Sequence, residues 1–378
     1  MGKCTFGVME NALKVRDIAA CLEAWAPRHV AESYDNVGLL VGNPSQGVKG
    51  VMVSLDCTEE VVREAIASDC NMIVSHHPLI FKGIKRLNGS TDAERAVMLA
   101  IEQGIALYAI HTNLDNVLTG VNHQLALLLG CAPHTHRILR PMAGGLEKWT
   151  VFVPTDHAEA VRQAMAQAGA GHVGAYDQCS FATPGTGTFR ALDGAKPFVG
   201  AMGEVHRESE IRLEMVVRSE VMAAVDKALH DAHPYEEVAL DRVILQNGRK
   251  DLGAGMVGEL PAPMAWRDFV DQAKHALGCT HVKHTAPTKP DVKRVACCGG
   301  SGAFLIEDAK RAGADVYVTS DIKYHEYFKA EGQILLLDVG HYESEWQTSG
   351  LIASKLKEKF PNFAVRLSAT RTNPVSFR

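Results

Sequence analysis

The stretch GVMVSLDCTEEVVREAIASDCNMIVSHHP, residues 50–78, decides the fold class. Its two apolar runs, at 50–55 and 71–75, are rich in β-formers, as strands buried inside a parallel sheet are. The segment between them, 58–67, has the composition of a helix, with Thr58 as a suitable N-cap and two glutamates in the first turn. A strand, a helix and a second strand in this order indicate a mostly parallel sheet covered by helices.

The same alternation continues toward both ends of the chain. In the N-terminal part, apolar periodicity predicts helices at 15–26, 93–103 and 121–129 and a strand at 105–110. In the C-terminal part, it predicts strands at 292–297, 315–319 and 334–337, and helices at 303–312 and from 341 to about 360. Strand starts at 51 and 72 match strand starts at 294 and 315 in spacing, so we expect two similar α/β halves with mostly parallel sheets.

The middle of the chain has a different pattern. Strands are expected at 149–154, 212–217 and 238–245 and helices at 157–168 and 220–232, with a Gly/Thr/Pro-rich loop or irregular strand at 181–200. This order is typical of a ferredoxin-like α+β domain. We therefore expect one discontinuous domain, 13–139 with 251–378, interrupted by an inserted domain at 140–250.

Composition excludes several classes of protein. With 46% hydrophobic and 22% charged residues among 378, the chain resembles an ordinary globular protein, and its net charge of −5 argues against broad nucleic-acid binding. It has no apolar run of the roughly 18 residues that a membrane span needs. The nine cysteines contain no Cys-x-x-Cys pair, which favours reduced thiols and a cytoplasmic location. Residues 1–11 lack the apolar block of a signal peptide, and we interpret residues 1–12 as a tail.

Histidines and carboxylates follow the predicted strands, where ligands bind in parallel α/β sheets. His76 and His77 follow one strand, Asp115 and His111 follow the next, and a pair four residues apart follows the last strand. That pair is His341 and Glu345. On a helix, positions i and i+4 share a face, so both can bind one ion, or the glutamate can bridge two. We predict a metal centre built from His76, His77, Asp115, His341 and Glu345.

Imidazoles and carboxylates without thiolates suit zinc, manganese, iron or cobalt, and the sequence does not choose among these four. His111 is a candidate ligand, positioning residue or proton carrier. Asp56, Asp321 and His325 also follow strands and are candidates for orienting a ligand or facing a substrate. The candidate catalytic residues are His111, Asp56 and His325.

Two further motifs have structural interpretations that we favour. Backbone amides of the glycine stretch 298–302 can cradle a phosphate ahead of a helix, but a tight packing turn explains these glycines better, since no Walker lysine follows. HPYEEVAL, residues 233–240, clusters histidine with glutamates in the middle segment, where we expect a solvated turn.

Taken together, these motifs resemble the GTP cyclohydrolase I type 2 homologues, also described as NGG-interacting-factor-three-like proteins. The resemblance spans nearly the whole chain after residue 13, and rests on YDNVGLLVG (34–42), SHHPLIF (75–81), HTNLD (111–115), CGGSG (298–302), SDIKYHE (320–326) and DVGHYESE (338–345). GHVGAYDQCSF (171–181) and HPYEEVA (233–239) are similar to the longer bacterial members, whose insert resembles PII and CutA-like trimeric domains.

The resemblance implies two divalent metal ions per chain, held by His76, His77, Asp115, His341 and Glu345, with Glu345 bridging. It also implies a homohexameric toroid built from trimers, with the metal sites facing an internal cavity. Ser344 stands where many members have Thr or Ala, a change that should leave the ligands undisturbed.

The function we expect is metal-dependent hydrolysis of a nucleotide-like or phosphate-bearing small molecule. GTP cyclohydrolase activity is attributed to few members of this family, so enzymatic activity stays an open question at this point. The alternative is a non-catalytic role in metal storage, metal delivery or regulation through the insert. A membrane partner is not expected, and the net charge makes nucleic acid the weaker third interpretation.

Overall fold

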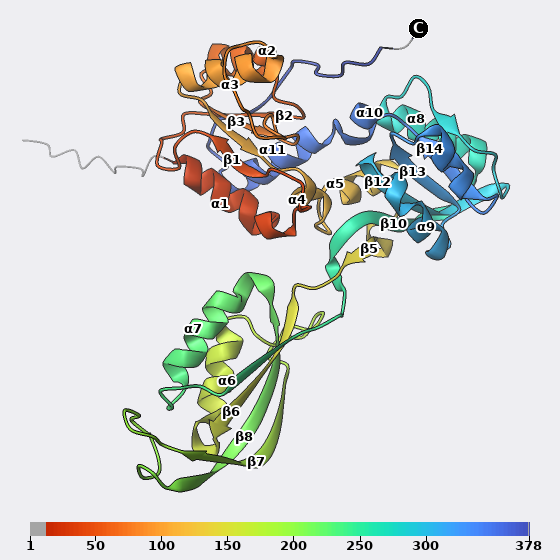
Figure 1. Ribbon diagram of the computed structural model, residues 1–378. Helices are drawn as coiled ribbons and strands as arrows, with labels where there is room; N and C mark the ends of the chain where they lie inside the picture. The colour runs from red at the N-terminus through yellow and green to blue at the C-terminus, as the bar shows by residue number, and fades with distance from the viewer. Residues whose placement is uncertain (1–12, 377) are drawn as a thin grey trace, which may run out of the picture. The chain divides into compact units, whose positions relative to one another are not determined.

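The computed structural model describes residues 13–376 and 378, so the predicted tail at 1–12 lies outside the described residues. The protein is of the mixed α/β class, with three sheets (Figure 1). It divides into two compact units: unit 1 consists of Met1–Pro141 and Lys250–Arg378, and unit 2 of Met142–Arg249. In the described part of the chain, no helix is long and apolar enough to cross a lipid bilayer.

The first sheet of unit 1 has the strand order β1-β4-β3-β2-β15. Its parallel strands are β2 (Val51–Ser54), β3 (Met72–Ser75), β4 (Ala106–Ala109) and β15 (Val365–Leu367). At the edge, β1 (Gly38–Val41) is antiparallel to β4. Every residue of β2, β3 and β4 is buried, as the apolar runs predicted for strands covered on both faces.

Helices cover both faces of this sheet (Figure 1). They are α1 (Val15–Trp25), α2 (Glu59–Ala67), α3 (Asp92–Glu102) and α11 (Thr348–Lys359). Helix α2 begins where the sequence predicts, because the Thr58 hydroxyl accepts a hydrogen bond from the Val61 N–H at 3.4 Å. Its apolar stripe, which includes Val61 and Ala65, packs with Ile73 and Leu107 of the sheet in one core cluster.

The second sheet of unit 1 has the order β11-β14-β13-β12-β10-β5. Three strands are parallel: β12 (Asp291–Ser301), β13 (Val316–Ser320) and β14 (Leu335–Asp338). Two are antiparallel to their neighbours: β10 (Arg249–Ala265) and β11 (Lys283–His284). The edge strand is β5 (Arg137–Met142). One face packs against α8 (Trp266–Leu277), and the other against α9 (Ile306–Arg311).

The two sheets share a pairing register. Val51 pairs with Met72 in the first sheet and Val295 with Val316 in the second, 21 positions further along the chain in each case. In both, a helix lies between the paired strands. Short helices complete unit 1: α4 (Thr112–Asp115), α5 (Val121–Leu128), α10 (His341–Glu345), and 3-10 turns at Arg28–Val30, Pro133–Thr135, Ala303–Leu305 and Tyr324–Ala330.

The helix predicted from 341 to about 360 is two helices, α10 and α11. The Gln347 side chain donates to the Ser344 carbonyl at 2.6 Å, the acceptor that the N–H of Thr348 would use in a continuous helix. The break keeps α10 short, so its residues belong to the site and not to the long covering helix.

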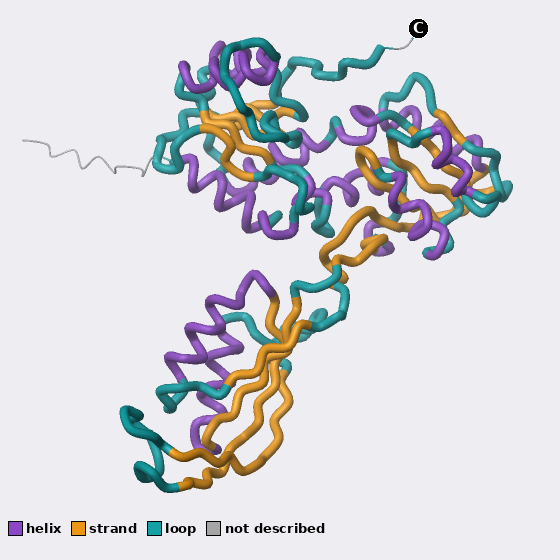
Figure 2. The backbone as a smooth tube through the Cα atoms, viewed as in Figure 1, coloured by secondary structure: helices purple, strands orange, loops and turns teal. Residues whose placement is uncertain are grey.

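Unit 2 is a four-stranded sheet, β7-β8-β6-β9, with two helices against one face (Figure 2). Its elements are β6 (Leu146–Pro154), α6 (Ala158–Gln167), β7 (Ser180–Arg190), β8 (Val205–Arg218), α7 (Met222–Ala232) and β9 (Leu240–Ile244), with 3-10 turns at Thr155–His157 and Ser219–Val221. The first half of the segment predicted as loop or irregular strand, 181–200, is the regular strand β7. It pairs with β8 along its whole length, a long-range contact that its two glycines and its proline conceal in the sequence.

Candidate metal centre

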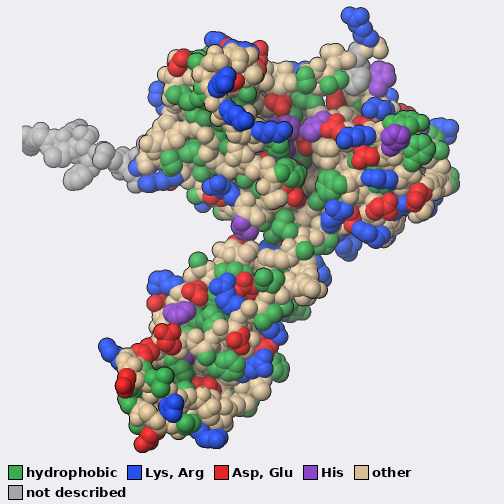
Figure 3. All heavy atoms as spheres, in the orientation of Figure 1, with side chains coloured by type: hydrophobic (Ala, Val, Ile, Leu, Met, Phe, Trp, Pro, Cys, Tyr) green, Lys and Arg blue, Asp and Glu red, His purple; other side chains and the backbone are tan. Residues whose placement is uncertain are grey.

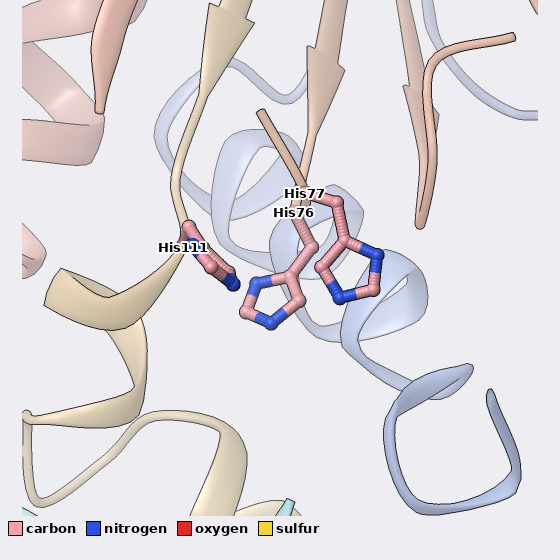
Figure 4. A group of neighbouring side chains, drawn as sticks. All are labelled: His76, His77 and His111. Carbon is pink, nitrogen blue, oxygen red and sulfur yellow. The ribbon is translucent and has the colours of Figure 1, made fainter. Parts of the chain in front are cut away.

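Three chain segments deliver the candidate ligands to one edge of unit 1. His76 and His77 come directly after β3, and His111 caps α4 directly after β4. The three rings lie at the carboxyl ends of these neighbouring strands and project toward a common space (Figure 4). Ring centroids are 5.0 Å apart for His76 and His77, and 5.2 Å for His76 and His111.

The third segment follows β14. Gly340, with φ +92°, turns the chain into α10, and a side chain at this position would overlap the Glu343 carboxylate. One turn of α10 then places His341 and Glu345 on the same face, with His341 Nε2 3.1 Å from Glu345 Oε2. Glu345 is buried although it is a carboxylate, which requires partners for its charge.

One group of three donors centres on Glu345 Oε2. His77 Nε2 lies 3.0 Å from this oxygen and His341 Nε2 lies 3.1 Å from it. All three ligand atoms fall within 4.8 Å of one another, so the group can hold a metal ion.

A second group uses the other oxygen of the same carboxylate. His76 Nε2 lies 3.7 Å from Asp115 Oδ1 and 3.9 Å from Glu345 Oε1. Both His76 Nε2 and Asp115 Oδ1 are buried without a hydrogen-bond partner among the described residues. His76 Nδ1 lies 2.8 Å from the Ile110 carbonyl, to which it must donate, so in the neutral ring Nε2 is the nitrogen with the lone pair.

Three electron-pair donors whose atoms face one another in the interior are unfavourable unless a proton or a metal ion lies between them. Tetrahedral zinc with bonds of about 2.1 Å separates its donors by about 3.4 Å. The observed separations of 3.7 and 3.9 Å are close to this value. The orphaned atoms and their spacing therefore fit a bound metal ion.

His111 belongs to a third group, with His76 and His77. Its Nδ1 lies 2.9 Å from Asp35 Oδ1, which leaves Nε2 available to a metal or a substrate. Asp35 also accepts from the Thr112 N–H at 3.0 Å, so the carboxylate fixes both the ring and the start of α4. Asp35 belongs to the motif YDNVGLLVG, which supports the family resemblance. The sequence alone does not predict that Asp35 orients His111.

Carboxylates orient two of the candidate ligands from behind. Asp56 Oδ1 lies 2.7 Å from His77 Nδ1, and Asp321 Oδ2 lies 2.7 Å from His341 Nδ1. Metal-binding histidines usually donate their second N–H to a carboxylate or carbonyl in this way. Asp56, a candidate catalytic residue, is therefore placed as a positioning residue for His77.

The titration of the cluster reflects these contacts. Burial acts to lower the pKa of His77, but hydrogen bonds to Asp56 and Glu345 outweigh it and raise the pKa to about 10. Burial and the nearby Glu345 carboxylate raise the pKa of Asp115 above its ordinary value. Burial opposes ionisation of Glu345, yet hydrogen bonds from the surrounding imidazoles hold its pKa well below the ordinary value. The cluster thus concentrates negative charge that protons or cations must balance.

The glycine stretch at 298–302 is not the turn that the sequence predicts. β12 runs through it to Ser301, and its amides are already engaged: Gly299 N–H donates to Asn122 and Gly300 N–H to Ser344, both at 2.9 Å. These two N–H groups are therefore not available to bind a phosphate. The glycines serve close approach instead, because a Cβ on Gly300, at φ +60°, would fall 2.5 Å from Glu345 Oε1.

His325 does not join the cluster. It lies in the 3-10 helix Tyr324–Ala330, where its ring contacts that of Tyr324 at 5.2 Å. Among residues 13–376, it is absent from the groups of converging donors. Its spacing after a strand suggested a site residue, but the intervening residues lead it into an exposed turn.

A pocket of about 490 Å³ opens beside the cluster. Asp56, His77, Asp321 and His341 line one side, and the C-terminal segment from Asn373 to Val375 lines another. In the space-filling view, histidine side chains are visible in a hollow of the larger unit, with acidic and basic side chains beside them (Figure 3). A small molecule in this pocket would therefore reach the candidate ligands.

Comparison with known proteins agrees with these features. Residues 13–374 match the model of the family Duf34/NIF3 (NGG1p interacting factor 3). The chain belongs to this family. A Bacillus subtilis relative named GTP cyclohydrolase 1 type 2 homolog is 37% identical over 373 residues, covering 98% of this chain and 100% of that one. A Mycobacterium leprae relative of the same name is 36% identical, covering 96% of this chain and 94% of its own.

Solved NIF3-related structures have the same fold. A Bacillus cereus protein related to NIF3 superposes with a TM-score of 0.82 at 36% identity, covering 97% of this chain and all of that one. A Staphylococcus aureus protein gives a TM-score of 0.78 at 29% identity, with 97% and 99% covered. The family predicted from the motifs is thus confirmed over nearly the full length of the chain.

Proposed function

We propose that this NIF3-family protein is a dinuclear metal-dependent hydrolase of a nucleotide-like or phosphate-bearing small molecule. The observation that carries the proposal is the pair of buried, unpartnered atoms His76 Nε2 and Asp115 Oδ1, which face Glu345. Buried polar atoms normally have hydrogen-bond partners, and a cation held between these two atoms and Glu345 would explain why they have none.

Two ions per chain are supported by the way the Glu345 carboxylate is shared. Oε2 faces His77 and His341, while Oε1 faces His76, so each oxygen belongs to a different donor group. In this proposal His76 and Asp115 would hold one ion, His77 and His341 would hold the other, and Glu345 would offer one carboxylate oxygen to each group. Zinc, manganese, iron and cobalt all accept such donors. Bound ions would supply activation of water and polarisation of a phosphoryl or carbonyl oxygen.

The rim of the site supports an anionic, ring-bearing substrate. The exposed rings of Tyr34 and Phe81 lie 6.3 Å apart, and Phe81 is also 6.3 Å from His111. Directly after Phe81 come three exposed cations, which have no ion-pair partner among residues 13–376; they are Lys82, Lys85 and Arg86. Aromatic faces can stack a base, and unpaired cations can neutralise phosphates.

Within this proposal, His111 is the proton carrier. Asp35 accepts from its Nδ1, which leaves Nε2 as the atom that takes or gives a proton in the pocket. Asp56 and Asp321 hold the rings of His77 and His341 in place, and act through those rings without touching the substrate.

The test is turnover by purified protein loaded with manganese, zinc or iron against a panel of nucleotides and phosphate esters. We expect hydrolysis with at least one metal, and its loss in His77→Ala. Glu59→Gln is a matched control, because Glu59 lies on α2 and pairs with Arg63 and Arg95 on the surface. Inactivity of the wild-type protein with every metal and substrate would refute the proposal.

Unit 2 favours a second candidate function, a non-catalytic metal-binding regulator or a protein for metal storage or delivery. The observation is that unit 2 is compact and holds a large pocket of its own. Ligand variants that keep every cellular phenotype of the wild type, apart from altered oligomer size, would favour a role of the metal in assembly. Small-molecule binding by residues 140–250 would favour regulation through unit 2.

We also propose that unit 2 is a ferredoxin-like insert of the PII and CutA type. Its element order, β6-α6-β7-β8-α7-β9, and its strand order, β7-β8-β6-β9, support this. A homohexamer built from trimers is the assembly we propose, to be tested by light scattering. The proposed location is the cytoplasm, supported by eight described cysteines that are all free.

A further inference from the structure

Unit 2 contains a pocket that has no part in the metal centre. It has a volume of about 610 Å³, and all its lining residues belong to unit 2. The pocket lies on the sheet face opposite the helices. Phe152, Arg212 and Thr183 are neighbours across three strands on this open face, whereas Leu213, the next residue of β8, faces α6 and α7.

A buried carboxylate stands at one wall of the pocket. Glu210 is only 7% exposed, and its Oε1 accepts a hydrogen bond from the Tyr235 hydroxyl at 3.0 Å. Its carboxylate lies directly against Gly187 of β7, where any Cβ would overlap it. The strand therefore has a glycine where the carboxylate needs space.

The Glu210 charge has no cationic partner among the described residues. Arg212, two residues further along β8, pairs with Glu214 at 2.8 Å. A hydroxyl alone is a weak counterpart for a carboxylate that is removed from water. The arrangement is that of a binding group that lacks its partner.

Aromatic residues line the same pocket as the carboxylate. The ring of Tyr235 lies 6.0 Å from that of Phe189 and 6.3 Å from that of Phe198, and all three residues line the pocket. Phe152 forms part of the same lining. Aromatic faces attract cations through their negative quadrupole, and an aromatic cage with a carboxylate is how proteins recognise organic ammonium groups.

We propose that this pocket binds a small organic ammonium ion, whose charged nitrogen contacts Glu210 between the rings of Phe189, Phe198 and Tyr235. Two other carboxylates, Glu236 and Glu237, line the pocket as well. The lining cations are Arg212, which pairs with Glu214, and Lys196, whose ammonium group has no carboxylate partner among the described residues. The three lining carboxylates therefore outnumber the unpaired cation, and the pocket as a whole favours positive charge. Threonines of β7 supply hydroxyls for the rest of such a ligand.

Titration calorimetry on the full-length protein tests the proposal with pairs of isosteres. Choline is compared with 3,3-dimethylbutan-1-ol, and phenethylamine with 2-phenylethanol, so that each pair differs in charge and little in shape. We expect at least one ammonium of the panel to bind about tenfold or more tightly than its neutral partner, because hydrogen bonds and contacts to a charged group are the stronger ones. Glu210→Gln should reduce that difference, because the carboxylate charge is lost while the aromatic rings remain.

Glu208→Gln is the matched control. Glu208 lies on the same strand but bonds to His206 at 2.8 Å and does not line the pocket, so its loss should leave ammonium binding unchanged. Should Glu210→Gln fail to fold, the wild-type isostere comparison and Phe198→Ala decide in its place, and Phe198→Ala should weaken binding several-fold.

Three outcomes would overturn the proposal. The first is equal affinity for charged and neutral isosteres, and the second is the absence of binding by every ammonium tested. The third is that the protection of β7 amides from hydrogen exchange increases with protein concentration and does not change when ammonium ions are added. That result would mean that a second copy of the chain covers this face.

Discussion

Removing the Asp56 carboxylate should weaken metal binding without removing a ligand. Asp56 Oδ1 lies 2.7 Å from His77 Nδ1, and its other oxygen accepts from the Thr372 hydroxyl, so the carboxylate is held from the C-terminal segment while it orients the ring. In metal sites, loss of such a partner typically reduces affinity by about 10- to 100-fold, or roughly 1.4–2.7 kcal/mol.

The geometry separates two substitutions at this position. Asn retains one oxygen that can still accept a hydrogen bond from His77 Nδ1–H, so Asp56→Asn should lose the charge but keep the ring in place. We expect its metal affinity to fall by about tenfold. Asp56→Ala removes both the charge and the hydrogen-bond acceptor and leaves the His77 ring free to rotate. We expect its metal affinity to fall by about 100-fold. Competition with a metal-chelating fluorophore at pH 7.5 measures both dissociation constants, with zinc and with manganese.

Glu59→Gln serves as the control for loss of a carboxylate outside the donor groups, because Glu59 is a partly exposed residue of α2 that pairs with Arg63 and Arg95. Circular dichroism verifies that each variant is folded. If Asp56→Ala binds metal as tightly as the wild type while His77→Ala does not bind, then Asp56 does not orient His77 and the reasoning fails.

Three other predictions concern the same unit. His111→Gln should lower turnover by roughly 100-fold or more while changing metal affinity far less, which steady-state kinetics and metal titration together measure. Gly300→Ala should cost roughly 1–3 kcal/mol in unfolding free energy and also weaken metal binding, because it strains a positive φ and crowds Glu345; urea denaturation with and without metal checks both effects. Burial acts to raise the pKa of Asp315, but bonds from the Arg294 and Lys293 N–H groups and from Lys289 lower it overall. Its contribution to stability is therefore present above the unfolded pKa of about 3.9 and is lost as pH falls below it, so Asp315→Asn should flatten the acid limb of a stability–pH curve.

Much of the fold follows from local pattern. The buried runs at β2, β3 and β4 are short, apolar and separated by capped helices, so their identity as strands is visible without any tertiary information. The family and the mixed α/β class, both predicted from the sequence, are confirmed.

The failures share a cause, which is that distant partners decide the local structure. The glycine stretch is strand because Asn122 and Ser344, far from it in sequence, take its amides. The strand β7 exists because β8 pairs with it, and the long predicted helix breaks where a side chain takes over a backbone acceptor. None of these partners can be recognised from periodicity.

The residues of the candidate site also fall into two groups, those that the sequence predicts and those that it does not. The histidines and carboxylates at strand ends are brought together because parallel strands end at one edge, a rule that needs only the order of elements. His325 also follows a parallel strand in the sequence, but the structure places it in an exposed 3-10 turn away from the donor groups. Asp35 precedes β1, an edge strand that we did not predict, so nothing marked it as the partner of His111.

The most direct test of the dinuclear centre is an anomalous-difference map from crystals of the protein soaked in zinc or manganese. Two peaks are predicted: one among His76, Asp115 and Glu345, and one among His77, His341 and Glu345. Empty density at both positions, or peaks only at other residues, would contradict the proposed metal centre.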